Sequence, residues 1–230
     1  MKQHESLTNV ANLTSSPLGE IAVALPGATA VFLAAGLDYC CGGQTTLKDA
    51  VAARSLDLDQ IVAELRKLNQ DQRPAPADLD TGSLIELIVS RFHRAHSREI
   101  PELIRLAQRV EAVHEKHASV PAGLADLLKR MLGELTIHMQ KEELVLFPRM
   151  KNGGAMPLQF PIATMMAEHR EHGAHLEEIR RLTNGLRVPD DGCATWRALY
   201  AGVSKFADDL VEHIHTENNI LFPRFQEKPA

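Results

Sequence analysis

The sequence predicts an all-α protein, an up-down-up-down four-helix bundle preceded by a small helical domain. Aromatic residues are only 4% of the chain and runs of β-branched residues are few, which favours helices over strands. Apolar residues recur at a helical period in the longer segments. A pattern that spans two helices also occurs twice between residues 81 and 226, and such a repeat indicates one helix pair that has been duplicated.

The first domain is predicted over residues 1–69, with its helices between residues 17 and 69. Proline is tolerated in the first turn of a helix, glycine ends helices, and Thr or Asp side chains cap their N-termini. A tight glycine-rich turn is expected at Asp38–Gly43. The predicted helices open at Pro17, run from Gly27 to Ala35 between Pro26 and Gly36, run from Thr46 to Ala53, and run from Asp57 to about Leu68.

Residues 70–80 hold two prolines and no apolar periodicity, and they are predicted to be a linker. The bundle is then predicted over residues 81–226. Short polar connections between long helices imply that successive helices are antiparallel neighbours. The four expected helices run over 81–117 with a kink or break at Pro101, over 121–147 with a stop at Pro148, over 158–184 with Gly185 after it, and over 191–222 with a stop at Pro223.

The core-facing positions of the first two bundle helices follow from the helical period. They are Leu84, Leu87, Ile88, Phe92, Leu124, Leu127, Leu128, Met131 and Leu135.

The repeated pattern is a His-x-x-x-Glu pair followed by Leu-Phe-Pro-Arg. One copy spans His138 to Arg149 and the other spans His213 to Arg224. A spacing of four residues puts the His and the Glu one turn apart on one helix face, so that both can bind the same metal centre. Upstream of each copy lies another His, at His93 and His169, and the two distances to the following motif are nearly equal.

The repeat therefore directs four imidazoles and two carboxylates towards one region of a bundle. Buried carboxylates without a cation would be costly in an apolar core, and a bound metal removes that cost. Bundles build two-metal sites from facing helices, and a nitrogen and oxygen ligand set without thiolate favours iron over structural zinc. The predicted ligands are His93, His138, Glu142, His169, His213 and Glu217.

Other polar residues near these ligands are assigned lesser roles. His96 and His172 are interpreted as supports of the ligands or as solvated. Glu134 and Glu168 are candidates to line a polar path to the metal or to hydrogen-bond a ligand. Surface or solvated positions are expected for the remaining group, His114, His117, His175, His215, Glu143 and Glu212.

The three cysteines do not form a disulfide framework. Cys40 and Cys41 lie in the predicted turn and are expected to be exposed. Adjacent cysteines rarely form a comfortable disulfide with each other, so these thiols could bind iron transiently, be nitrosylated, or attack another disulfide. The alternative is a pair of small residues tolerated in a turn. Cys193 is interpreted as incidental.

Composition excludes several functions. The net charge of −5 offers no electrostatic case for nucleic-acid binding. The sequence contains no apolar stretch long enough to span a membrane, and its first residues do not form a signal peptide. A cytoplasmic location is therefore expected.

The chain resembles the iron-sulfur cluster repair family, the hemerythrin-like di-iron "repair of iron centres" proteins. The resemblance spans nearly the whole chain, and the Asp-Tyr-Cys-Cys-Gly-Gly turn together with the duplicated His-x-x-x-Glu motif makes it specific. The segments that carry it are Pro17–Glu20, Leu37–Gly43, Met139–Glu143, Leu146–Pro148, Glu217–Asn219 and Pro223–Arg224.

This resemblance implies a hemerythrin-like bundle with a bridged centre of two non-haem irons on the six ligands named above. It implies a cytoplasmic role in restoring iron-sulfur clusters damaged by nitric oxide or oxidants, with damaged iron-sulfur proteins and small gases as partners. Homodimers are common in the family. The chain departs from oxygen-carrying hemerythrins, because Gly173 stands where they have a second His of a His-x-x-x-His pair, and because Glu217 lies four residues after His213 where they have Asp five after a His.

Fewer imidazoles and more carboxylates favour ferric and labile iron over reversible oxygen transport. The leading hypothesis is a stress-response protein that donates iron to damaged clusters, assisted by Cys40 and Cys41. The alternatives are a di-iron nitric oxide reductase, which would be an enzyme, and a sensor of oxygen or nitric oxide.

Overall fold

The computed structural model describes residues 10–25, 27–68, 76–153 and 157–226. This part of the chain is helical, without a β-strand; one isolated bridge joins Pro17 and Thr46. The all-α prediction is confirmed. The chain divides into two compact units, here called the N-terminal unit (residues 1–84 and 214–230) and the bundle unit (residues 85–213).

The described part of the N-terminal unit begins with a helix that was not predicted, α1 (Val10–Ser15). It continues with α2 (Leu18–Ala24), α3 (Ala28–Ala34), α4 (Leu47–Ala53) and α5 (Leu58–Lys67). Two predicted N-caps form, since Thr46 accepts a hydrogen bond from the Asp49 backbone N–H at 3.2 Å and Asp57 accepts one from the Gln60 N–H at 3.1 Å. Gly36 follows α3 with φ +66°, the left-handed conformation that glycine adopts most easily. Pro26 and most of the predicted linker, residues 70–75, lie outside the described residues.

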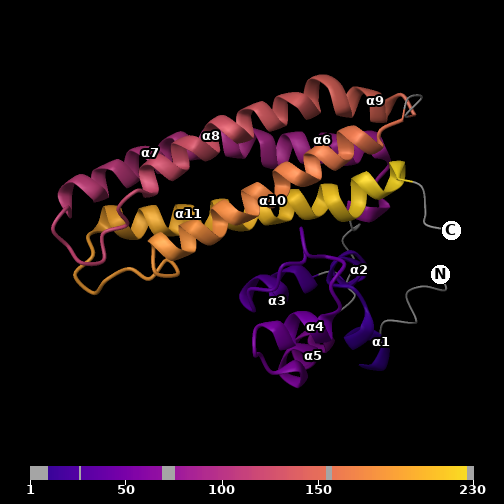
Figure 1. Cartoon of the computed structure of the whole chain (residues 1–230), viewed down its shortest axis with the longest axis horizontal. Coiled ribbons are helices and arrows are strands. Elements are labelled where there is room, and N and C mark those ends of the chain that lie inside the picture. Colours follow the sequence, from indigo (N-terminus) through magenta and orange to yellow (C-terminus); the bar gives the residue numbers. More distant parts are fainter. Residues whose placement is uncertain (1–9, 26, 69–75, 154–156, 227–230) are drawn as a thin grey trace. The chain divides into compact units, whose positions relative to one another are not determined.

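The long helices follow η2 (Pro76–Asp78), and most of their residues belong to the bundle unit. Successive long helices reverse direction along one axis, as the up-down-up-down prediction requires (Figure 1). The first long helical stretch consists of α6 (Thr81–Ile88), η3 (Val89–His93) and α7 (Arg94–Val113). The second consists of α8 (Leu124–Lys141), η4 (Glu142–Leu146) and α9 (Phe147–Lys151). The third stretch is α10 (Gln159–Leu182), and the fourth consists of α11 (Ala194–His215), η5 (Thr216–Leu221) and η6 (Phe222–Phe225).

Pro101 and Pro148 interrupt the helices less than predicted. Helix α7 runs through Pro101, and the helix predicted to stop at Pro148 continues to Lys151. Pro148 is the second residue of α9, in the first helical turn where proline is tolerated, and a segment of wider π-helix (η4) ends directly before that helix. Gly185 does end α10: its N–H donates to the Arg180 carbonyl at 2.7 Å, with φ +68°.

The predicted core positions are buried, with one shift. Leu87 is half-buried, and Ile85 takes its place in the core at 2% exposure. The other predicted positions are at most 2% exposed: Leu84, Ile88, Phe92, Leu124, Leu127, Leu128, Met131 and Leu135. The apolar period therefore located the core face correctly, and this face holds the polar ligands described below.

The C-terminal end divides differently from the predicted boundary of 81–226. Residues 214–230 group with the N-terminal unit, because η5 packs against α2 and against η2. Glycine allows this close packing, since a Cβ on Gly19 would lie 2.6 Å from the Asn219 Oδ1 atom. None of the helices in the described ranges is both long and apolar enough to cross a membrane.

Candidate metal centre

Five of the six predicted ligands lie within the bundle unit. His93 ends η3, His138 lies in the last turn of α8, and Glu142 opens η4. His169 lies on α10 and His213 lies near the end of α11. Each of these side chains is at most 2% exposed, which is unusual for ionisable residues and marks the cluster as specialised.

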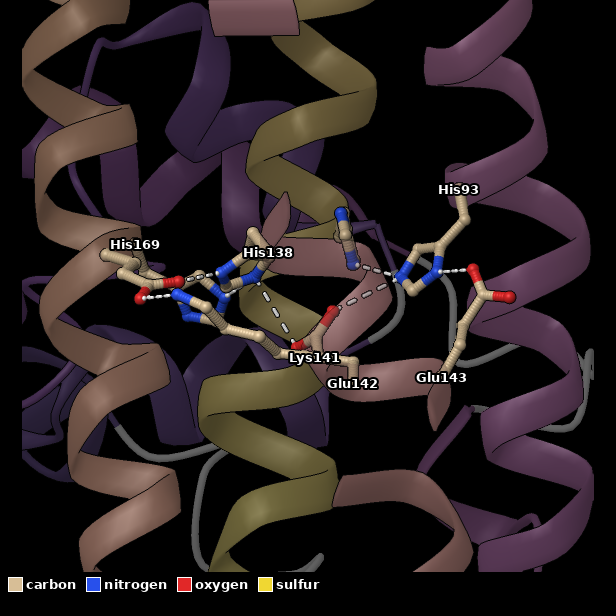
Figure 2. Close-up of polar contacts among 8 residues, drawn as sticks. His93, His138, Lys141, Glu142, Glu143 and His169 are labelled. Atoms are coloured by element: carbon tan, nitrogen blue, oxygen red, sulfur yellow. Dashed lines mark hydrogen bonds and ion pairs between the residues drawn. The ribbon is translucent and has the colours of Figure 1, made fainter. Parts of the chain in front are cut away.

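Glu142 lies at the centre of the five residues. Ligand atoms of His93, Glu142 and His213 lie within 4.8 Å of one another, and so do those of His138, Glu142 and His169. The Glu142 oxygens are 3.5 Å from His93 Nε2 and 3.4 Å from His138 Nε2. Figure 2 shows His93 and His138 turned towards this carboxylate from two sides.

The imidazoles are also paired across the bundle. His93 Nε2 and His213 Nε2 are 3.1 Å apart, and His138 Nε2 and His169 Nε2 are 3.0 Å apart. Two imidazole nitrogens with a carboxylate oxygen beside them form a compact nitrogen and oxygen donor set on each side of Glu142. These two donor sets fit metal ions, because a cation would compensate a carboxylate that is otherwise buried at 0% exposure.

Glu217 lies four residues after His213 in a helix that continues without interruption from α11 into η5. Its side chain is fully buried. Glu217 belongs to η5, which groups with the N-terminal unit, and one helical turn separates it from His213 along the chain.

Three π-helical segments carry candidate ligands. His93 closes η3, Glu142 opens η4, and Glu217 lies in η5. Single π-helical turns inside α-helices are rare and are found most often at functional sites, because the extra residue per turn redirects side chains. Both copies of the repeated motif contain such a turn directly before the Phe-Pro pair. Sequence reasoning missed the π-helices, although the repeated motif with its proline was the signal.

Carboxylates orient two of the ligand rings from behind. The Nδ1 of His93 is 2.8 Å from Glu143 Oε1, and the Nδ1 of His138 is 2.8 Å from Glu168 Oε2. Lys141 donates to the other Glu168 oxygen at 2.5 Å. A ring that donates from Nδ1 presents its Nε2 lone pair to the metal side. Glu143 is exposed, as expected, and its carboxylate also contacts a ligand ring. Glu168 lies where a support of a ligand was expected.

A third group of side chains that could bind a metal ion lies beside His138. Ligand atoms of Glu134, His172 and His175 lie within 4.8 Å of one another. Burial, the largest cause, and neighbouring imidazoles lower the pKa of His172 to about 3, so the ring is neutral at physiological pH. His175, expected on the surface, is half-buried and lies 3.3 Å from the Glu134 carboxylate.

His96, the repeat equivalent of His172, has a different environment. Its ring is 1% exposed and packs edge-on against Phe206, with ring centroids 5.5 Å apart. It also contacts the rings of Phe92 and His213. His96 is therefore a packed core histidine beside a ligand. Glu212, expected to be solvated, is half-buried.

The cysteine turn lies in the N-terminal unit. Cys40 is 8% exposed, contrary to the expected exposure of both thiols, while Cys41 is partly exposed. Cys40 Sγ lies 3.9 Å from Cys41 Sγ and 3.3 Å from Asp38 Oδ1. The hydrogen bond with Cys41, burial, and the charges of Cys41 and Asp38 raise the pKa of the Cys40 thiol well above its ordinary value.

Asparagines that follow Glu217 hold this turn in place. Asn218 donates from Nδ2 to the Cys40 carbonyl at 3.1 Å, and Asn219 donates to the Tyr39 carbonyl at 3.2 Å. His215, expected on the surface, is 3% exposed and packs edge-on against Tyr39. Burial lowers the pKa of His215 to about 4. Sequence reasoning missed this anchoring, although the repeat broke its own pattern at Asn218 and Asn219.

Cys193, interpreted as incidental because no partner was expected for it, does have a partner. Cys193 directly precedes α11, and its Sγ lies 3.2 Å from His114 Nε2. The hydrogen bond with His114, the largest cause, lowers the pKa of Cys193 to about 7. His117 lies 3.2 Å from Asp191 Oδ1, so neither of these half-buried histidines is a plain surface residue.

A surface pocket of about 380 Å³ lies beside the donor set that contains His93. One of its walls is Glu143, whose carboxylate contacts the ligand His93. The pocket therefore exposes the carboxylate that contacts His93, while His93 itself is 2% exposed. The remaining lining residues are Ile85, Val89, Phe147, Pro148, Lys151 and Asn152.

Comparison with known proteins matches both parts of the chain. Residues 84–225 match the hemerythrin HHE cation binding domain, and residues 14–69 match a domain of unknown function, ScdA_N. The iron-sulfur cluster repair protein YtfE of Dickeya chrysanthemi is 47% identical over 210 residues, covering 90% of this chain and 95% of its own length. YtfE of Escherichia coli O81 is 46% identical over 213 residues and YtfE of Pectobacterium atrosepticum is 44% identical, with 90% of this chain and 95% of each relative covered. Together with the buried histidine and glutamate donor sets, these matches show that the chain belongs to the iron-sulfur cluster repair family.

Proposed function

We propose that the chain holds two non-haem irons and donates iron to iron-sulfur clusters damaged by nitrosative or oxidative stress. The observation that carries the proposal is the pair of donor sets that share Glu142, in a chain similar over 90% of its length to iron-sulfur cluster repair proteins. Iron held in such a set supplies redox chemistry and a metal ion that can be transferred.

The proposed ligands are divided between two irons. His93 and His213 bind one, His138 and His169 bind the other, and Glu142 lies between them with its oxygens towards both sides. Glu217 is assigned as the second shared carboxylate, because it repeats the position of Glu142 relative to its own His and is fully buried. Glu143 and Glu168 hold two of the rings in the orientation that presents Nε2.

The cysteine turn is proposed to receive iron or to contact a client protein. Asp38, Cys40 and Cys41 place one carboxylate and two sulfur atoms within 4.8 Å of one another. Sulfur donors suit both iron and the cysteines of a damaged cluster. Since the raised pKa keeps the Cys40 thiol protonated at neutral pH, metal binding there would release its proton, which suits brief rather than permanent binding.

The remaining parts of the proposal concern partners and location. Damaged iron-sulfur proteins are the proposed clients, nitric oxide and oxygen are the proposed small-molecule partners, and the cytoplasm is the proposed location. Nucleic acid and membranes are not proposed as partners. We also propose a homodimer, which a molar mass measured by light scattering would test.

The decisive experiment measures reactivation of a nitrosylated iron-sulfur enzyme by purified protein with known iron content. We expect about two irons per chain, the number that a bridged bundle site holds. We also expect reactivation to fall when Cys40 and Cys41 are both changed to Ser, with the iron content and the optical spectrum unchanged. Cys193→Ser is the matched control, since this third thiol lies in the bundle unit, and it should leave both measurements unchanged.

Each of the following results would contradict a part of the proposal. One tightly bound zinc without iron would refute the iron centre. Unchanged reactivation by the double cysteine variant would reduce the turn to a structural feature, and a lost spectrum would place the thiols among the ligands. Multiple-turnover formation of nitrous oxide without reactivation would instead support a nitric oxide reductase, and a gas-dependent change in partner binding alone would support a sensor.

A further inference from the structure

The Glu134, His172 and His175 cluster is separate in its residues from the proposed two-iron centre. Glu134 comes from α8, one turn before His138, and the two histidines lie three residues apart on α10. Residues three apart share a helix face, so the two rings and the carboxylate that faces them converge. Two imidazoles and one carboxylate are a ligand set that proteins use for zinc and for ferrous iron.

Inside this cluster, hydrogen-bonding capacity is left unused. His172 is 3% exposed, and neither of its ring nitrogens has a hydrogen-bond partner. The Nδ1 of His175 and one oxygen of Glu134 are 3.3 Å apart, but their alignment does not make a hydrogen bond. Buried polar atoms are nearly always satisfied, so three residues with unused donor or acceptor atoms at one place indicate a ligand that binds there.

The repeat equivalents of this cluster show what else could occupy such a place. The residue that corresponds to His175 is Glu99, and the one that corresponds to Glu134 is Asp209. There the ammonium of Lys205 lies between the carboxylates, 2.8 Å from Glu99 and 2.7 Å from Asp209. The equivalent of Lys205 is Arg130, which is exposed and acts electrostatically on Glu178. The Glu134 cluster therefore has the acidic residue but not the cation of its counterpart.

We propose that Glu134, His172 and His175 form a third metal site, which binds one divalent first-row transition-metal ion. The two imidazole rings supply ring nitrogens, Glu134 supplies a carboxylate, and solvent fills the remaining positions, since His175 is half-buried and Glu134 is exposed at its outer edge. The site stands independently of the proposed repair function, because none of its residues belongs to the two-iron ligand set. A bare ion pair between Glu134 and His175 is the competing explanation.

The test titrates the iron-loaded, full-length protein with Co²⁺, a divalent probe whose visible absorption reports its ligands. Wild type is compared with Glu134→Gln and His175→Gln, two near-isosteric changes. Glu99→Gln, at the position equivalent to His175, is the matched control. We expect wild type and Glu99→Gln to bind one more Co²⁺ per chain than the two site variants do at the same Co²⁺ concentration. The affinity of the site variants for this ion should be at least about 100-fold lower, since even the loss of an outer hydrogen-bond partner costs 10–100-fold. Circular dichroism melting shows whether each variant is folded.

Equal cobalt binding by wild type and both folded site variants would overturn the proposal and leave the ion pair as the explanation. A loss of the same size in Glu99→Gln would also overturn it. Iron content is measured in parallel and should be the same in all four proteins. A protein that holds no iron would refute the two-iron centre, while the difference in cobalt binding between wild type and the site variants would still decide the third site.

Discussion

The two sides of the metal centre use equivalent ligands but differ in what surrounds them. On the α8–α10 side, His138 is held by Glu168, and Glu134, His172 and His175 cluster beside it. On the α7–α11 side, the residue equivalent to Glu168 is Phe92, which stacks on His213 with ring centroids 5.3 Å apart.

The other equivalent positions differ in the same way. On the α7–α11 side, Lys205 neutralises the acidic pair Glu99 and Asp209, whereas no lysine takes this place beside Glu134. A duplicated helix pair can therefore keep its metal ligands while the residues around them diverge. One side has become polar with spare donor atoms, and the other has become apolar or internally neutralised.

The largest effect should come from the residue that the two sides share. Glu142→Ala should abolish tight iron binding on both sides, because its oxygens face His93 and His138. Glu217→Ala should behave in the same way if it is the second shared carboxylate. His96→Ala, beside the ligands but packed against Phe206, should lose far less iron. Iron content after gel filtration measures this. An equal loss in all three variants would mean that the ligand assignment is wrong.

A smaller effect should come from the carboxylates behind the rings, one from each side. Glu168→Gln and Glu143→Gln each remove the negative charge that faces a ligand Nδ1, and each should lower iron affinity by about 10–100-fold. Competition against a calibrated chelator measures the affinity. If neither substitution alters the affinity, the two carboxylates are incidental neighbours and the sides differ less than the geometry indicates.

The α7–α11 side also carries a reactive thiol that the other side lacks. Because the pKa of Cys193 is lowered to about 7, about half of it is thiolate at pH 7, whereas the raised pKa of Cys40 keeps that thiol protonated. Alkylation at pH 7 should therefore modify Cys193 on the order of ten times faster than Cys40. His114→Ala should slow the modification of Cys193 at pH 7, and this difference should vanish at pH values well above the ordinary thiol pKa. Peptide mass spectrometry of timed samples measures both rates, and a His114→Ala protein that reacts like wild type would rule out activation by the imidazole.

The smallest effect concerns stability. Lys205→Met should destabilise the fold by about 0.2–1 kcal/mol at pH 7, because Lys205 is half-exposed and surface ion pairs contribute little. Burial raises the pKa of Glu99, but hydrogen bonds from Lys205 and Arg98 outweigh it and leave the pKa below its ordinary value. A carboxylate with a lowered pKa stabilises the fold above its unfolded pKa and loses that contribution in acid. The difference between variant and wild type in urea unfolding should therefore shrink as the pH falls below about 4; a difference that grew in acid would contradict this account.

Much of the fold and of the candidate centre could be predicted from local patterns. The apolar period located the core face of the first two bundle helices. Leu87 was the one predicted core residue that is only half-buried, and Ile85 is buried in the core instead. The repeat identified His93, His138, Glu142, His169 and His213, which the structure brings together. These features were accessible because helix geometry fixes which residues share a face, whatever the helix packs against.

Pairs between distant segments could not be predicted in this way. His215 was expected on the surface but is buried against Tyr39, and Cys193 was expected to be incidental but faces His114. Both contacts join residues more than 70 positions apart, so no local spacing encodes them.

The sequence by itself determined most of the helices, the duplicated ligand frame and the family. The tertiary structure decided which polar residues face one another across the helices: Glu143 against His93, Glu134 against His175, and Asn218 against the Cys40 carbonyl. The physical reason is that a helix fixes the direction of a side chain relative to its own axis, whereas burial, pKa and pairing depend on the neighbour that tertiary packing places opposite it.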